Sequence, residues 1–247
     1  MRGLLTALVM IGSATAATAA AAQPPSNRFT IAVNGGVESA TSRLQDDFRF
    51  DEGPEAGTIT ARYPAPQAVL VDGGLAVRLA PRIRGGVVVS YSTATSGARI
   101  DAGIPHPFHF DRLRPVEGSS SKLTRNETSV HAQIQYVLRL TRRLHAVVGG
   151  GPTYFRVTRH LIDRVEYDQE YPYDAATFRF ATSRRARGSG MGFNAGSEIV
   201  WSLTRRTGLG ASVRFARGSV DLRAAGGREV GVDAGGVQAG AGLRVSF

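Results

Sequence analysis

The sequence predicts an all-β protein, an eight-stranded antiparallel up-and-down barrel that crosses a membrane. Three observations predict this fold class. Segments of 11 to 16 residues alternate apolar and polar side chains with a period of two, as barrel strands do. Short turns alternate with long polar stretches along the chain. The last segment places Leu243, Val245 and Phe247 on one face and stops on that aromatic residue, as a paired strand at a membrane interface would.

The first 22 residues have the pattern of a secretory signal peptide. Arg2 is followed by a short apolar stretch at 4–12 and by small residues at 13–22. The apolar stretch is too short for a transmembrane helix, which needs about 20 residues. We therefore expect cleavage near Ala22 and a barrel domain over residues 23–247, with a membrane-anchored N-terminus as the alternative.

Composition limits the possible partners. The chain has no cysteine, so disulfides are excluded although the export signal indicates an oxidising compartment. The net charge is +10 and Lys122 is the only lysine, so nearly all of the basic charge is arginine. A basic chain can bind nucleic acid, but export separates this one from it and the arginines form no single run. We expect no nucleic-acid partner.

The alternation places the strands and the connections between them. Three similar tight turns are predicted at 79–84, 140–144 and 203–207. Long polar loops are predicted at 39–68, 96–127, 159–187 and 222–233. Eight strands are predicted at 28–38, 69–80, 83–95, 128–140, 144–157, 188–203, 207–221 and 234–247. The even number of strands puts both termini on the side of the short turns.

The composition of the two faces favours an apolar face turned outward. Small residues recur beside charged ones on the polar face, as a narrow lumen filled by side chains requires. Phe29, Tyr91, Trp201 and Phe247 lie near strand ends, where interface aromatics occur. A soluble, lipocalin-like barrel with the apolar face inside is the alternative. The stretch 149–152 leaves the register of the fifth expected strand open.

This layout resembles the small outer-membrane barrels of bacteria, of the OmpA-barrel, OmpX and OmpW type. In that family the last strand is the signal for the barrel-assembly machinery, and the matching positions here are Gly242, Leu243, Val245 and Phe247. The resemblance implies a monomer in the outer membrane, with short periplasmic turns and four extracellular loops.

Seven charged residues are expected to face the lumen: Glu38, Asp72, Arg78, Arg84, Glu198, Arg214 and Arg244. Charges in a narrow interior must be paired, and eight strands leave little free space. We therefore expect a plug of ion pairs rather than a gated pore for small solutes. Counting outward from the turn at 203–207 predicts that Glu198 pairs with Arg214.

A second group of arginines is expected at the extracellular rim. Arg184, Arg185 and Arg187 suit lipopolysaccharide phosphates, because a guanidinium binds phosphate well. Arg156, Arg159 and Arg217 are near them in strand order and are expected at the same rim. Lipopolysaccharide contact and a merely solubilising loop edge both remain open.

We find no pattern for catalysis or for metal binding. No serine, histidine and acid have a spacing that defines a triad. His106 and His109, like the acidic stretch 46–52, are expected in solvated loops, so we expect no catalytic residue, cofactor or metal. The predicted function is a non-enzymatic barrel with a structural or interaction role through its loops. A narrow small-solute channel and a lipid-A-modifying enzyme are the alternatives.

Overall fold

The structure is a computed structural model that describes residues 28–40 and 42–247. The expected signal peptide lies outside the described residues, so it stays a prediction. Within this part of the chain, all strands belong to one antiparallel sheet. The ten strands are β1 (Phe29–Ala40), β2 (Leu44–Glu52), β3 (Glu55–Tyr63), β4 (Gln67–Ala80), β5 (Ile83–Pro105), β6 (Leu113–Arg139), β7 (Leu144–Gln169), β8 (Ala176–Ser202), β9 (Thr207–Arg223) and β10 (Glu229–Ser246). A 3₁₀ turn, η1 (Ala225–Gly227), joins β9 to β10.

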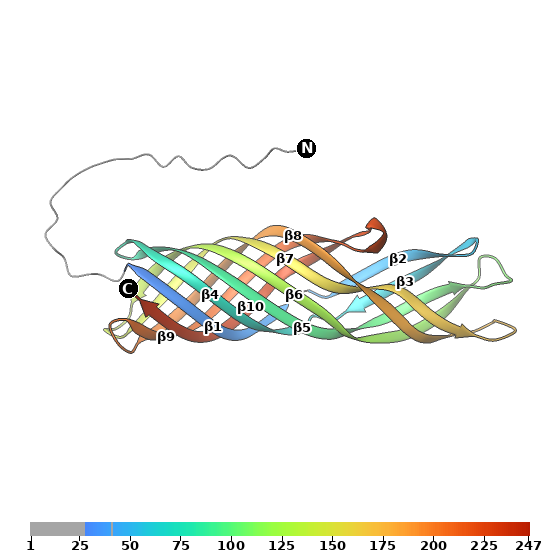
Figure 1. Ribbon diagram of the computed structural model, residues 1–247, viewed down its shortest axis with the longest axis horizontal. Helices are drawn as coiled ribbons and strands as arrows, with labels where there is room; N and C mark the ends of the chain where they lie inside the picture. The colour runs from blue at the N-terminus through green and yellow to red at the C-terminus, as the bar shows by residue number, and fades with distance from the viewer. Residues whose placement is uncertain (1–27, 41) are drawn as a thin grey trace, which may run out of the picture.

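Eight of the strands close a ring in the order β1-β4-β5-β6-β7-β8-β9-β10. The ring closes because β1 pairs with β10, and β5 pairs with both β4 and β6. The predicted antiparallel barrel is confirmed, but the predicted total of eight strands is wrong, because β2 and β3 form a further hairpin attached to β5. Figure 1 shows the C-terminus beside the short turns at one end of the barrel, and the β2–β3 hairpin at the other.

A belt of exposed apolar side chains surrounds the half of the barrel nearest the short turns. On β5 the belt runs from Ile83 to Tyr91, which suits the ~9–11 residues that a tilted strand needs to cross a membrane. Such a surface is stable only against lipid, and a closed ring leaves no strand edge unpaired there. The belt includes Ile31, Val33, Val37, Val71, Leu75, Val87, Val89, Ile134, Leu138, Val148, Ile199, Leu209, Val213, Val237 and Leu243. The outward apolar face is therefore confirmed, and the lipocalin-like alternative is wrong.

Aromatic residues mark the edges of this belt. Phe29, Trp201 and Phe247 are exposed at the edge near the short turns, and Tyr91 and Tyr154 are exposed at the opposite edge. Aromatic side chains concentrate at the two membrane–water interfaces of membrane barrels. The positions therefore fix the span of the barrel that lipid covers.

The strands continue far beyond the belt, so the predicted loops at 96–127 and 159–187 are wrong. β5 extends to Pro105 and β7 to Gln169. In this region the apolar side chains point inward: Ile100, Leu161 and Leu222 are fully buried. This outer half of the barrel stands in water, so an apolar interior and a polar exterior are the stable arrangement.

The predicted loop at 39–68 is likewise mostly strand, because it contains the β2–β3 hairpin. Ile59 and Tyr63 on β3 are buried in the same apolar interior. On β2, Asp46 pairs with Arg228 of the β9–β10 connection at 3.1 Å, and the Arg228 guanidinium lies 3.8 Å from the centre of the Phe48 ring. Burial raises the pKa of Asp46, and Arg228 opposes that shift. The hairpin thus replaces β1 and β4 in the wall above the membrane.

The three tight turns lie where the sequence predicts them, and two share one geometry. The Thr141 hydroxyl accepts a hydrogen bond from the amide of Leu144, and the Thr204 hydroxyl accepts one from the amide of Thr207, both at 3.0 Å. A hydroxyl in this position stabilises a turn by bonding backbone groups that lack a strand partner.

The register that the sequence left open is resolved at Pro152, which pairs with Phe193 and faces outward. The ladder between β6 and β7 is interrupted beside Pro152, which has no N–H to donate. The Asn194 side-chain amide donates from inside the lumen to the carbonyl oxygens of Gly151 at 2.9 Å and Pro152 at 3.3 Å. Asn194 therefore binds backbone groups at the interruption.

A charge at the centre of the belt should destabilise the barrel, and the same charge above it should not. We expect Val87→Arg to lower the free energy of unfolding by about 2–4 kcal/mol, the range for an arginine on the lipid face near the midplane of the membrane. Thr95→Arg, on the outward face of the same strand but above the belt, is the matched control and should cost under ~1 kcal/mol. Urea unfolding in phospholipid vesicles measures both. Equal losses of unfolding free energy in the two variants would mean that lipid does not cover the barrel at the height of this belt.

Candidate functional site

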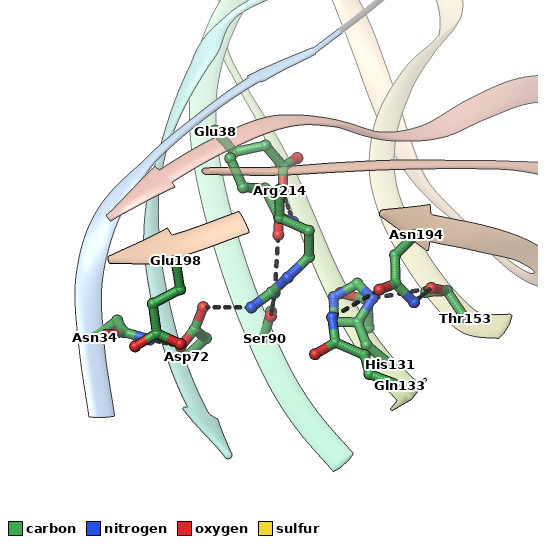
Figure 2. Close-up of polar contacts among 12 residues, drawn as sticks. Asn34, Glu38, Asp72, Ser90, His131, Gln133, Thr153, Asn194, Glu198 and Arg214 are labelled. Atoms are coloured by element: carbon green, nitrogen blue, oxygen red, sulfur yellow. Dashed lines mark hydrogen bonds and ion pairs between the residues drawn. The ribbon is translucent and has the colours of Figure 1, made fainter. Parts of the chain in front are cut away.

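The lumen inside the membrane span is filled by a network of charged and polar side chains. Arg214 of β9 reaches across the lumen to β4 and β5. It donates to Asp72 at 3.3 Å, to Ser90 at 3.1 Å and to Gln238 at 3.1 Å. Figure 2 shows the Arg214 guanidinium pointing toward Asp72 and Ser90. All four side chains are buried, so Arg214 ties together four strands of the ring.

A second ion pair, Arg244 with Glu198, joins this network through Asn34. The Arg244 guanidinium also donates to the Asn34 side-chain oxygen at 2.6 Å, and the Asn34 amide donates to Asp72 at 2.5 Å. Each charge therefore has an opposite charge beside it, which offsets the cost of removing it from water.

The expected pair of Glu198 with Arg214 is wrong. Along the β8–β9 ladder Glu198 lies opposite Ser212, and Arg214 lies opposite Gly196. Arg214 pairs instead with Asp72 across the lumen, since a long guanidinium side chain reaches beyond its neighbouring strand.

Toward the outside of the cell, the network continues as two glutamates around one arginine. Arg125 donates to Glu127 at 2.5 Å and lies 3.8 Å from Glu38. Glu38 also accepts a hydrogen bond from Gln238 at 2.9 Å, and Glu127 accepts one from the Gly235 amide at 2.9 Å. Gly235 has a φ of +84°, a conformation that favours glycine. Sequence reasoning missed Arg125 and Glu127, because both lie in a stretch predicted to be a loop.

A buried serine–histidine pair lies beside this network. His131 is fully buried, 3.0 Å from the Ser129 hydroxyl through Nε2 and 2.9 Å from the Thr153 hydroxyl through Nδ1. Thr153 in turn accepts a hydrogen bond from Asn194 at 2.9 Å. Figure 2 shows His131, Thr153, Asn194 and Gln133 together on one side of the lumen. The sequence analysis found no serine and histidine with the spacing of a catalytic triad, so this serine–histidine contact was not foreseen.

Between the network and the periplasmic turns lies a cavity of about 460 Å³. Arg78 and Arg84, the two remaining members of the predicted lumen set, line it together with Arg139 and His145. The cavity reaches the β8–β9 turn, which is at the periplasmic end. The structure thus brings five of the seven predicted charges into one network and places two in the cavity below it.

Above the network, an apolar core fills the outer half of the barrel. Phe155 lies edge-on to His131, with ring centroids 6.4 Å apart, where the polar layer meets this core. The core contains Ile59, Ala61, Tyr63, Ala98, Ile100, Ala102, Ile104, Val116, Leu123, Phe155, Val157, Leu161, Ile162, Val165, Ala186, Ala216, Val220, Leu222, Val230, Val232 and Ala234. The Tyr63 hydroxyl accepts a hydrogen bond from the Ile162 amide at 2.8 Å, and burial raises the pKa of this hydroxyl to about 12. The lumen is therefore filled by two successive layers of different chemistry.

The arginines expected at the extracellular rim are separated by the structure. Arg185 and Arg187 are exposed on β8, whereas Arg184 pairs with Asp163 at 2.9 Å. Arg156 is exposed on β7, but Arg159 on the same strand is buried.

The predicted assembly-signal residues lie in the wall where the ring closes. Leu243 is exposed in the belt opposite Val33, and Phe247 donates its amide to the Phe29 carbonyl at 2.9 Å. Gly242 is required here, since a Cβ would approach the Val33 carbonyl oxygen to 1.8 Å. Val245 is half-buried on the same strand.

The extracellular tip carries a further pocket of about 290 Å³ beside His106. The His106 side chain is buried, with its Nε2 3.8 Å from Asp174, and its ring centroid lies 4.6 Å from that of His109. The His106 pKa is lowered, first by desolvation and then by neighbouring cations. Phe108 and Phe110 are exposed beside it. No cluster of three metal-ligating side chains occurs in the described residues, and the same residues contain no helix that is long and apolar enough to cross a membrane.

A closed antiparallel ring with a lipid-facing belt defines this protein as an integral outer-membrane β-barrel. No protein-family model matches the sequence, and no curated protein matches it. Among solved structures, the fold is similar to the outer membrane protein OprG from Pseudomonas aeruginosa, with 10% identity, a TM-score of 0.47, and 90% of this chain and 96% of that chain covered.

It is also similar to Neisserial surface protein A, with 12% identity, a TM-score of 0.44, and 90% and 98% of the two chains covered. A third similar structure is the outer membrane protease OmpT from Escherichia coli, with 8% identity, a TM-score of 0.47, and 90% and 97% covered. Identities this low leave activity to be argued from the residues of this chain.

The new pairing predicts which charges are energetically coupled. Arg214→Gln and Asp72→Asn should each lower the free energy of unfolding by about 3–5 kcal/mol, because each substitution leaves a buried charge without its partner. The double variant should cost less than the sum by ~1–3 kcal/mol. A parallel cycle of Arg214→Gln with Glu198→Gln should show weaker coupling. Urea unfolding in micelles measures both cycles, and stronger coupling to Glu198 would contradict the geometry.

Proposed function

We propose that this protein is a sealed, non-enzymatic outer-membrane barrel that displays a rigid extracellular head for interaction. The observation that carries the proposal is the filled lumen, in which the Arg214 network lies directly below a buried apolar core. A solute entering the periplasmic cavity would meet paired charges and then tightly packed apolar side chains. Both layers would have to move before anything passed, which argues against the small-solute channel.

The buried serine–histidine pair does not support the enzyme alternative. Ser129 and His131 are both shielded from solvent, and their described partners include no carboxylate that would orient the histidine as a base. A lipid substrate on the outside of the barrel would have no route to the Ser129 hydroxyl or to the His131 imidazole. We infer that these side chains satisfy one another within the wall.

The extracellular head supplies the surfaces for interaction. The hairpins β2–β3, β5–β6 and β7–β8 project together beyond the membrane (Figure 1). Their ends carry exposed aromatic residues, namely Phe108, Phe110 and Tyr171. Exposed aromatic side chains on an ordered surface are typical of binding sites.

Lipopolysaccharide is the partner that we propose for the outer wall. Arg156, Arg185, Arg187, Arg217 and Arg223 form what we call the rim patch, on the outward face of β7, β8 and β9. Cross-strand pairing places Arg187 between Thr158 and Arg223. The patch begins directly above the belt, at the height where lipid phosphates lie.

The charges of the rim patch are only partly balanced by the protein. Arg217 lies 3.7 Å from Asp233, and Arg223 lies 4.0 Å from Glu229. Arg156, Arg185 and Arg187 make no ion pair with any residue in the described ranges. An outward guanidinium without an acid, held at headgroup level, suits a phosphate ligand.

The wild-type barrel should not conduct in planar lipid bilayers. Single-channel recording at neutral pH, with a general porin as positive control, should show no stable open state, because the polar layer and the core both close the lumen. A reproducible conductance, unchanged by the purification detergent, would overturn the sealed-barrel proposal and favour the channel.

Removing the unbalanced rim arginines should weaken lipopolysaccharide binding. We expect Arg185→Gln/Arg187→Gln to lose at least about tenfold in affinity for lipid-A-containing vesicles over phosphatidylcholine vesicles, since each lost charge-assisted contact contributes ~1 kcal/mol. Arg179→Gln, a substitution higher on the same strand, is the control. Unchanged affinity in the double variant would favour the solubilising role.

A further inference from the structure

A pocket of about 290 Å³ lies where β1 and β4 end and the β2–β3 hairpin begins to form the wall above the membrane. β1 ends at Ala40, opposite Gly236 of β10. Above that point β10 continues to pair with β9, and the described residues show no backbone pairing between β10 and β2. We call this space the seam pocket; Arg43, Arg125, Arg159, Ser219 and Asp233 are among the residues that line it.

Arg159 is the residue that makes this pocket unusual. Its exposed fraction is only 8%, yet among the described residues it has no acidic partner and no hydrogen-bond partner. Its guanidinium carbon lies 4.7 Å from the centre of the Tyr63 ring. Desolvation, followed by the repulsion of Arg125, lowers the pKa of Arg159 to about 10. A buried cation without a counter-charge is expensive to maintain.

The other charges around the pocket do not balance Arg159. Arg125 is committed to Glu127 and Glu38, at 2.5 and 3.8 Å. Asp233 lies 3.7 Å from Arg217 on the outer wall. Arg43 is exposed at the mouth and makes no ion pair with the rest of the described chain. The pocket therefore has an excess of positive charge.

We propose that the seam pocket is a binding site for a phosphate-class anion, held between the guanidinium groups of Arg159 and Arg43. Two guanidiniums supply planar, charge-assisted donors that suit phosphate oxygens. Ser219 also lines the pocket. The bound anion supplies the counter-charge that Arg159 lacks within the protein.

Two sources of a phosphate-class anion can reach the pocket. Ser219 and Asp233 pair with each other a few residues above Val213 and Val237, the last exposed apolar residues of the belt on β9 and β10. The mouth is therefore at headgroup height, where a phosphomonoester of an outer-leaflet lipid is available. Free phosphate from the medium is the other source. Anion binding at the seam pocket does not depend on whether the lumen conducts.

The first test uses inorganic phosphate and the full-length barrel folded in micelles. At equal ionic strength, phosphate should raise the urea midpoint of the wild type relative to chloride. Arg159→Gln should abolish this rise, and Arg43→Gln, an exposed position that should not impair folding, should reduce it. Arg99→Gln, an exposed arginine on the outward face of β5, is the control and should keep the full rise.

A second experiment identifies whether the bound anion is a lipid phosphate or free phosphate. Vesicles of phosphatidylcholine alone are compared with the same vesicles containing diphosphorylated lipid A. Stabilisation by lipid A that needs both Arg159 and Arg43, without an effect of inorganic phosphate, supports the site with a lipid ligand. An effect of both ligands supports the site with either source. Stabilisation that is equal in all variants, or absent with both ligands, overturns the proposal.

Discussion

The closed hydrogen-bonded ring is the constraint on which the rest of this structure depends. Every strand has a neighbour on both sides within the membrane span, so no backbone edge meets lipid. Closure also fixes which side chains face inward, because successive residues alternate between the two faces. Eight strands enclose a narrow interior, and the inward side chains must fill it without leaving an unpaired charge.

The chain meets this constraint differently at two heights. Within the membrane, lipid covers the outward apolar face, and the lumen is filled by paired charges such as Arg214 with Asp72. Beyond the membrane, water covers the outside, and the lumen is filled by apolar side chains such as Phe155 and Leu222. The same alternating ladder therefore carries opposite patterns of polarity on its two halves. The boundary between them is where the lumen changes from a polar network to an apolar core.

This reversal explains which parts of the fold could be predicted from the sequence. The membrane strands and their tight turns were accessible, because outward apolar residues such as Ile134 and Val213 alternate with polar ones between short turns. The outer halves of β5 to β8 were predicted to be loops because their outward residues are polar. Ile100, Ala102 and Ile104 do keep the period of two, and that signal could have revealed a strand.

The side-chain pairing was less accessible than the strands. The alternation in the sequence identified which charges face the lumen. The pairing prediction, however, compared only residues that are neighbours across one hairpin. In the structure, Arg214 reaches a carboxylate on a strand that is 142 residues away in the chain. Glu127 and Arg159 were missed as buried charges, because their roles depend on the outer barrel and the β2–β3 hairpin. Such contacts follow from closure and cannot be counted along one hairpin.

The most direct test of the account is a profile of water access along the inward face of β9. The protein has no cysteine, so single cysteines can be introduced at Ser212, Ala216 and Val220 without background. A small, membrane-impermeant thiol reagent should label position 212 from the periplasmic side. Positions 216 and 220, which lie in the buried core, should remain unlabelled from both sides of the intact membrane. Labelling of all three positions at similar rates would show a continuous aqueous path and contradict the sealed lumen.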